Sequence, residues 1–224
     1  MPDKINDYFY SQEVLRKYLK NGFLFLYQGY ETVLKTKRYK LSEQSKNLEN
    51  DIRDDILRVA EANLKEESLR NRENKLLEFK FKNEPRNISD EDDTKRIDIE
   101  LIFAIPAYIP DLIIECKRLK NNEKNLAYIN NGVQRFVIGR YGEELPAAGM
   151  IGFIEAGNET EIVADLSNRL SQRPETISTI QQHENETFPD EYADHVYHSI
   201  HQRENLSPIE LFHLMLDFCE IIEP

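Results

Sequence analysis

Two charged residues lie inside an otherwise apolar stretch of the sequence. Residues 112–117 are apolar except for Glu115 and Lys117. Burying a charged carboxylate costs free energy unless a partner compensates it, and Lys117 is the nearest candidate. On a β-strand, side chains two residues apart point to the same face. The pattern therefore predicts that Glu115 and Lys117 project side by side into one site, where a metal ion would compensate the carboxylate further.

A second acid should lie near Glu115, and two aspartates are candidates. Asp111 is on the same strand, but four residues at about 3.3 Å each separate it from Glu115 by roughly 13 Å, too far to share a metal ion. Asp98, on the preceding strand, can come within one strand spacing of about 5 Å. We therefore expect Asp98 and Glu115 to hold Mg²⁺ through oxygen ligands. Such an ion would activate a water molecule for attack on a phosphodiester, with Lys117 positioning that water or neutralising the phosphate.

The hydrophobic pattern around these residues predicts the elements that position them. Apolar residues recur at helical spacing over 42–65, and residues 77–82 and 97–103 alternate like half-buried strands. The polar and acidic residues 83–94 between those strands predict an exposed loop. The stretch 112–116 is typical of a central strand covered on both faces. A helix from 126 to about 139 and a strand at 149–154 follow.

The two ends of the chain are predicted to be mainly helical. Residues 11–20 form an amphipathic pattern that Gly22 would end, and the aromatic-rich residues 23–30 indicate core packing. A helix at 161–170 and a polar loop at 171–185 are expected next. Ser207, Pro208 and Glu210 then resemble a capping box that opens a helix through Phe218. We therefore expect a helical N-terminal extension at 1–40, a core at 41–170, and a C-terminal loop and helix at 171–224 packed on the core.

Asp98 followed by Glu115-Cys116-Lys117 resembles the PD-(D/E)XK signature of restriction-endonuclease-like nucleases. Arg96-Ile97 stands where that signature has a proline. The predicted order of a helix, three strands, a helix and a fourth strand is also similar to the core of that family. The resemblance implies an α/β fold with a central mixed four-stranded sheet flanked by helices. It also implies endonucleolytic hydrolysis of phosphodiester bonds, in DNA rather than RNA, with Mg²⁺ or Mn²⁺ as cofactor.

The same resemblance implies further site residues. In that family the first helix often supplies another acid for the metal ions, which would be Glu49 here, with Asp55 as the rival. Gln134 and Arg135 resemble residues that the family places near the scissile phosphate, and Tyr141 is a weaker addition. Two alternatives stay open: Asp98, Glu115 and Lys117 form a structural salt-bridge cluster, or Gln134 and Arg135 belong to an exposed helix face.

The formal net charge of −12 limits how this chain could bind nucleic acid. Binding to phosphates usually rests on clustered Lys and Arg, so a protein that coats nucleic acid by bulk charge is excluded. A local basic rim, or a partner, would have to supply the grip. We therefore expect a homo-oligomer or a subunit of a larger complex, and the resemblance to restriction-endonuclease-like nucleases implies the effector of a restriction or antiviral defence system. The alternative function is a non-catalytic scaffold that keeps the nuclease fold.

Other features of the sequence concern its compartment and its histidines. The longest apolar stretches fall short of the roughly 20 residues that cross a bilayer, and no signal-peptide pattern is visible. Two cysteines inside apolar stretches indicate a reducing, cytoplasmic location and no structural zinc. His195, His198 and His201 are expected to be packing or surface residues, with His201 and Arg203 as a weak phosphate-contact hypothesis.

Overall fold

The structure is a computed structural model that describes residues 4–40, 47–74, 78–83, 97–103, 111–120, 122–182 and 190–223. The loop predicted at 83–94 lies outside these residues except for Asn83. Of the helices that the structure describes, none combines the length and the apolar character needed to cross a bilayer.

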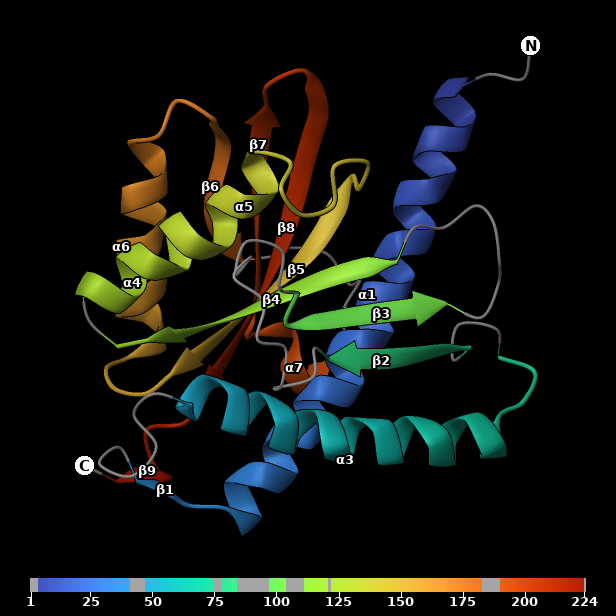
Figure 1. The fold of residues 1–224 in the computed structure, drawn as a ribbon, viewed down its shortest axis with the longest axis vertical. Coiled ribbons are helices and arrows are strands. Elements are labelled where there is room, and N and C mark those ends of the chain that lie inside the picture. Colours follow the sequence, from blue (N-terminus) through green and yellow to red (C-terminus); the bar gives the residue numbers. More distant parts are fainter. Residues whose placement is uncertain are drawn as a thin grey trace, which may run out of the picture.

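A mixed seven-stranded sheet forms the centre of the described fold (Figure 1). Neighbouring strands are antiparallel at both ends of the sheet and parallel in the middle, where β4, β5 and β8 lie side by side. In spatial order the strands are β2 (Phe79–Asn83), β3 (Ile99–Phe103), β4 (Leu112–Leu119), β5 (Ala147–Ile154), β8 (Leu206–Asp217), β7 (Val196–Arg203) and β6 (Thr176–Gln182). The expected α/β class is confirmed, but the expectation of four strands is wrong.

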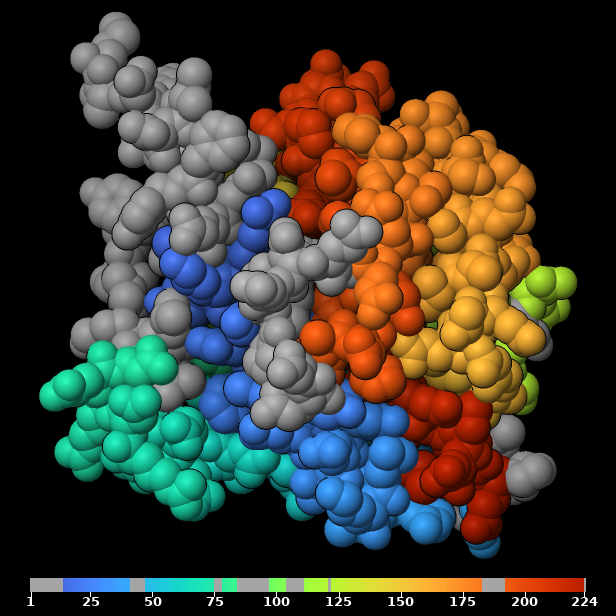
Figure 2. All heavy atoms as spheres, turned by 180° about the vertical axis from the view of Figure 1, so that it is seen from behind, coloured from blue at the N-terminus to red at the C-terminus, as the bar shows by residue number. Residues whose placement is uncertain are grey.

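Helices cover both faces of this sheet. One face carries α1 (Lys4–Thr36) and α3 (Leu48–Arg70), and the other carries α4 (Asn122–Tyr128), a π-helical turn η2 (Ile129–Val133), α5 (Gln134–Val137) and α6 (Glu159–Ser171). A short helix α7 (Asp190–Ala193) precedes β7, and β1 (Tyr39–Lys40) pairs in parallel with β9 (Ile222–Glu223). Figure 2 shows the molecule from behind, where the blue atoms of α1 lie between the blue-green atoms of α3 and the orange and red C-terminal part.

Alternating side chains of β4 supply both layers of the core. Ile114 and Cys116 pack with α1 and α3, whereas Ile113 and Leu119 pack with α4, η2 and α6. Glu115 and Lys117 belong by alternation to the second of these faces. The central-strand prediction for 112–116 is therefore confirmed, and the strand continues to Leu119.

The prediction that a helix ends at Gly22 is wrong, because α1 continues to Thr36. A Cβ on Gly22 would lie 2.7 Å from Leu101 Cδ1, and one on Gly29 would lie 2.6 Å from the backbone oxygen of Ile56. Both glycines therefore allow close approach to β3 and α3. Tertiary packing outweighs the helix propensity that glycine lowers by about 1 kcal/mol.

The C-terminal part of the chain is β-structure, so the predicted loop at 171–185 and the predicted helix from Ser207 are both wrong. Residues 176–182 form β6, and residues 206–217 form β8, which lies between β5 and β7. The capping-box pattern misled because the residues after Pro208 are nearly all apolar, which also suits a strand covered on both faces. Pro208 falls where the register of β7 and β8 shifts, and there a missing N–H costs little. Strands β6, β7 and β8 therefore complete the sheet instead of packing on a finished core.

His201 of β7 and His213 of β8 take part in a buried chain of hydrogen bonds. Tyr128 Oη lies 2.8 Å from His213 Nδ1, and Ser199 Oγ lies 2.8 Å from both His213 Nε2 and His201 Nε2. All four side chains are buried. Each hydrogen bond has one donor if Tyr128 donates to His213, His213 donates to Ser199 and Ser199 donates to His201. In that arrangement both imidazoles are neutral. Burial and the Arg173 cation lower the pKa of His201 to about 4, and burial also lowers that of His213.

The hypothesis that His201 and Arg203 contact phosphate is wrong, because both side chains are buried. His201 is fully buried, and Arg203 donates hydrogen bonds to the backbone oxygens of Ser207, Gly142 and Leu145. Arg203 therefore fastens the loop before β5 to the β7–β8 turn. His195 and His198 are paired with Glu159 and Glu210, respectively, as packing or surface histidines.

Protonation of the buried histidines should destabilise the fold as the pH falls. Below about 6.5 the unfolded chain takes up a proton that folded His201 refuses, so the free energy of unfolding falls until the pH reaches about 4. Other buried groups titrate in this range, so the effect is measured as a difference between variants. In urea unfolding between about pH 5.5 and 4.5, His201→Gln should remove roughly 1 kcal/mol per pH unit of this slope. His195→Gln should leave the slope in place there, because Glu159 raises the pKa of His195 and both the folded and the unfolded chain hold that proton. Equal slopes for wild type and His201→Gln would contradict the prediction.

Candidate active site at the divergence of strands β3 and β4

Acidic side chains from three elements meet the ammonium group of Lys117. Its Nζ lies 2.8 Å from Glu115 Oε1, 3.5 Å from Asp98 Oδ2 and 3.5 Å from Glu49 Oε1. Pairing of β3 with β4 ends at Ile99 and Ile114, so Asp98 stands across from Glu115 where the two strands diverge. The structure thus brings together four of the residues singled out from the sequence.

The two rejected or rival acids lie elsewhere. Asp111 is exposed just before β4, where the nearby groups that influence its carboxyl include Glu100 and the backbone of Phe103. Asp55 accepts a hydrogen bond from Tyr39 and pairs with Lys37, so it faces away from Lys117. Asp98, and not Asp111, therefore lies beside Glu115 and Lys117. Glu49, in the first turn of α3, is the helix acid of the cluster, and its Oε2 accepts a 3.1 Å hydrogen bond from the Arg118 backbone N–H.

Asp98 is held in place by contacts on both of its carboxylate oxygens. Arg53 NH1 lies 3.0 Å from Oδ1, and the backbone N–H of Cys116 donates to Oδ2 at 2.8 Å. The Arg53 side chain is only 5% exposed and also pairs with Asp54. Arg53 was missed from the sequence, although it lies four residues after Glu49 on the same helix face, which is a signal that could have found it.

Glu115 is the most buried acid of the cluster, with 1% of its side chain exposed. Its Oε1 accepts from Lys117 and from Arg135 NH1, each at 2.8 Å, whereas its Oε2 has no hydrogen-bond partner. Burial and the neighbouring Asp98 charge raise the pKa of Glu115 to about 8, and burial also raises that of Glu49. Burial opposes the charge of Lys117, but Glu115, Glu49 and Asp98 together raise the pKa of its ammonium group, which stays protonated.

Arg135 reaches Glu115 from the helical segment that crosses β4. Its NH1 also donates to Tyr141 Oη at 2.8 Å, and its guanidinium carbon lies 5.3 Å from the centre of the Tyr141 ring. The segment runs close to the strand at Gly132, where a Cβ would lie 2.6 Å from Met150 Cε and 3.5 Å from Lys117 Cγ. Of the two residues that the resemblance pointed to here, Arg135 therefore contacts Glu115 directly, and Tyr141 contacts Arg135.

Gln134 does not join the cluster. Its Oε1 accepts a 3.3 Å hydrogen bond from Arg173 NH1, and Arg173 also contacts the side chain of Asn130. This places Gln134 on a polar patch between α5 and the loop that follows α6, beside its neighbour Arg135 but turned away from Glu115.

A second ion pair, missed from the sequence, is buried beside the cluster. Arg118 binds the carboxylate of Glu155, which follows β5 and whose side chain is fully buried. Because the backbone N–H of Arg118 also holds Glu49, this pair stands directly behind the acids. Lys117 and Arg118 are consecutive on one strand, so their side chains point to opposite faces. Only Lys117 shares the face of Glu115 and was assigned a role from the sequence.

The donor set fits a hard divalent cation in its chemistry. Carboxylate oxygens are the ligands that Mg²⁺ prefers, and Glu115 Oε2 is a buried oxygen that receives no hydrogen bond. As the side chains stand, no group of three or more His, Cys, Asp or Glu among the described residues is spaced to hold a metal ion. The carboxylates instead converge on the Lys117 ammonium, so the acids would have to close around an ion on one side of it.

Comparison with models of known protein families, with curated proteins and with solved structures found no significant match to this chain.

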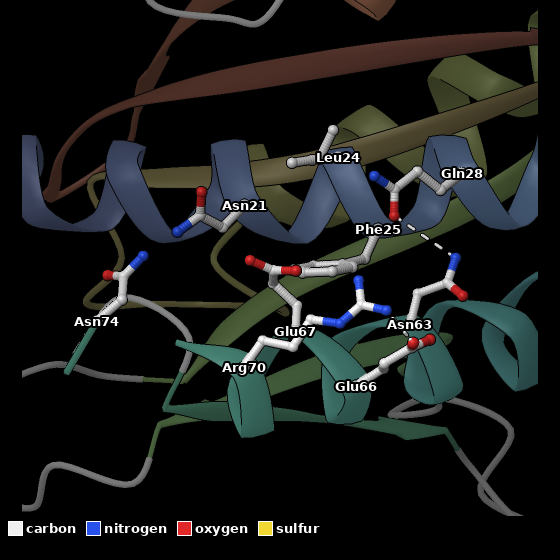
Figure 3. A pocket seen from close by; sticks show the side chains of 9 residues that line it. All are labelled: Asn21, Leu24, Phe25, Gln28, Asn63, Glu66, Glu67, Arg70 and Asn74. Atoms are coloured by element: carbon white, nitrogen blue, oxygen red, sulfur yellow. Dashed lines mark hydrogen bonds and ion pairs between the residues drawn. The ribbon is translucent and has the colours of Figure 1, made fainter. Parts of the chain in front are cut away.

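A cleft of about 400 Å³ opens between α1 and α3, but it contains none of the predicted site residues (Figure 3). Amide side chains of both helices reach into it, and Asn63 Nδ2 lies 3.5 Å from Gln28 Oε1. Its remaining walls include Phe25, Glu67 and Arg70. The acid cluster, where the charges of Glu115 and Lys117 converge with those of two further acids, sits near the opposite end of α3.

Proposed function

We propose that this protein is a metal-dependent nuclease that hydrolyses phosphodiester bonds as an endonuclease, with DNA as the preferred substrate. One observation carries this proposal: Glu49, Asp98 and Glu115 come from three different elements and meet around Lys117. Holding three acids together, one of them fully buried and two partly exposed, costs free energy that a purely structural role does not require. Metal-dependent hydrolysis gives this arrangement a use.

The order of elements around the cluster supports the proposal. Helix α3 is followed by the antiparallel strands β2, β3 and β4, then by a helical crossover to β5, which is parallel to β4. This is the order that the PD-(D/E)XK resemblance implies for a nuclease core. Strands β6 to β8 extend the sheet on the far side of β5 and carry none of the proposed site residues.

Each residue of the cluster has a role in the proposed reaction. A bound Mg²⁺ or Mn²⁺ ion would supply polarisation of the phosphodiester and a more acidic water molecule. Glu115, Asp98 and Glu49 are the proposed ligands. Lys117 keeps its proton and can orient the attacking water or neutralise the phosphate. Arg53 is a positioning residue that fixes the rotamer of Asp98.

The net charge of −12 bears on how substrate is held. We propose that the protein works as a homo-oligomer or as the nuclease subunit of a larger assembly, such as a restriction or antiviral defence system, in which a partner contributes the basic surface. Recovery of free monomer alone from native cells would count against this part of the proposal.

A cleavage assay tests the nuclease directly. Supercoiled plasmid, linear DNA and RNA are incubated with Mn²⁺ and with wild type, Glu115→Gln or Asp111→Asn. Wild type should cut the plasmid internally, and Glu115→Gln should be slower by at least about a hundredfold because it removes a charged ligand. Asp111→Asn makes the same change of charge on the exposed residue before the strand and should cleave like wild type.

Calorimetric titration with Mn²⁺ separates the nuclease from a scaffold that only keeps its fold. The nuclease requires binding that Asp98→Asn weakens, whereas a scaffold would be indifferent to the metal. Equal cleavage by wild type and Glu115→Gln would refute the assignment, whichever substrate is cut.

A further inference from the structure

Two arginines flank the acid cluster, and they differ in exposure. Arg53 has 5% of its side chain exposed and is fixed between Asp54 and Asp98. Arg135 is 23% exposed and reaches Glu115 from the surface side. Burial and two carboxylate partners hold the Arg53 side chain in one position. A partly exposed arginine at the edge of a site can turn outward.

Arg135 uses the same carboxylate that the proposed function assigns to the metal ion. Two cations, Lys117 Nζ and Arg135 NH1, share Glu115 Oε1 at 2.8 Å each, while Oε2 receives no hydrogen bond. A divalent cation bound by Glu115 would therefore lie close to the Arg135 guanidinium. Two unit charges 4 Å apart repel by about 4 kcal/mol at an effective dielectric constant of 20, and a divalent ion doubles this. The ion pair of Arg135 with Glu115 and the binding of a metal ion to Glu115 thus compete.

Tyr141 gives Arg135 a second hold that does not depend on Glu115. The guanidinium contacts the Tyr141 hydroxyl at 2.8 Å and lies 5.3 Å from the centre of its ring. An aromatic ring attracts a cation without neutralising it. Released from Glu115, Arg135 would stay beside the site as a charged fork, and such a fork matches the oxygens of a phosphodiester.

We propose that Arg135 couples metal binding to phosphodiester binding: paired with Glu115 it is withheld from nucleic acid, and a divalent cation at Glu115 releases it to bind phosphate. This inference rests on the proposed nuclease function. Coupling between two ligands is reciprocal, so bound nucleic acid must strengthen metal binding by the same factor. This coupling would keep the protein from binding DNA tightly before a metal ion is bound at Glu115.

The test is DNA binding measured with and without metal. The probe is a fluorescent DNA duplex followed by anisotropy, in EDTA or in Ca²⁺, which takes oxygen ligands like Mg²⁺ and is used to limit cleavage. Arg135→Met should leave the affinity in EDTA unchanged and lower it about tenfold in Ca²⁺, within the usual range of coupling between sites. The matched control is Arg140→Met, which removes the same charge from the exposed loop after α5. Any contribution of Arg140 should be the same in both conditions.

A second pair of variants tests the withheld state directly. At about pH 9, above the raised pKa of Glu115, Glu115→Gln removes the charged partner of Arg135 and should raise the affinity for the duplex in EDTA. Glu49→Gln makes the same change of charge, but Glu49 contacts Lys117 and the Arg118 backbone instead of Arg135. Its affinity for the duplex in EDTA should therefore stay about threefold below that of Glu115→Gln, because a surface ion pair contributes roughly 0.2 to 1 kcal/mol.

Two results would overturn the inference and leave the nuclease standing. One is an equal loss of affinity in EDTA and in Ca²⁺ for Arg135→Met, as for a simple surface cation. The other is the same affinity for Glu115→Gln and Glu49→Gln in EDTA. If wild type binds neither Ca²⁺ nor Mn²⁺ in calorimetry, the proposed function and this inference fail together.

Discussion

Replacing Lys117 with methionine is expected to slow cleavage by at least about a hundredfold, while Mn²⁺ binds at least as tightly as it does to wild type. Methionine is close to lysine in length and removes only the ammonium group, which contacts Glu115, Asp98 and Glu49. The cleavage rate falls because the water or the phosphate loses its positive partner. The carboxylates keep their positions on three different elements and remain available to an ion.

The same variant should become unusually dependent on metal for its stability. Removing one partner from a buried ion-pair cluster costs about 3 kcal/mol, because the remaining charges are left uncompensated. A divalent cation restores that compensation. Thermal unfolding with and without Mn²⁺ should therefore show a larger stabilisation by metal for Lys117→Met than for wild type.

A control variant and the response to Mn²⁺ distinguish a catalytic from a structural role of the acids around Lys117. Lys120→Met removes the same charge from the exposed residue that follows β4, and it should match wild type in cleavage and in its response to metal. If Lys117→Met is destabilised and Mn²⁺ does not restore its stability, the acids and Lys117 are a structural salt-bridge cluster. Undiminished cleavage would equally exclude the role assigned to Lys117.

The acid cluster was predictable from the sequence because its signal is local. A charged residue inside an apolar stretch is costly, the period of a strand fixes which neighbours share its face, and strand geometry separates Asp98 from Asp111. Only residues close in sequence and one adjacent strand are involved. Glu49 needed the resemblance as well, because nothing local distinguishes it from Asp55.

The features that escaped prediction depend on distant partners. Arg53 is an ordinary helix arginine until Asp98, 45 residues later, is placed beside it. Gly22 has the propensity of a helix end, but the side chain of Leu101 on β3 explains its presence inside α1. Residues 206–217 carry a capping pattern and an apolar run at once, and only the flanking strands β5 and β7 decide for a strand.

Replacing Arg118 with methionine should destabilise the fold by about 3 to 5 kcal/mol, because it leaves a fully buried carboxylate on Glu155 without its cation. Urea unfolding of Arg118→Met, Glu155→Leu and the double variant gives the pairwise energy as a double-mutant cycle. The double variant should recover most of the loss, since a buried ion pair can be exchanged for apolar side chains of similar volume at little cost. A loss below about 1 kcal/mol for Arg118→Met would mean that water reaches Glu155 and that the pair behaves like a surface salt bridge.

The contrast with Lys117 is what makes this pair informative about the site. Arg118 and Glu155 compensate each other, so removing both leaves no net charge behind, and cleavage by the double variant should persist if β4 keeps its position. Arg118 also holds Glu49 through its backbone N–H, which no side-chain replacement removes. At Lys117, by contrast, one ammonium contacts three carboxylates, so no single paired replacement neutralises the group. An ion-pair site that tolerates double replacement is part of the scaffold, and one that needs an added cation to recover its stability is a binding site.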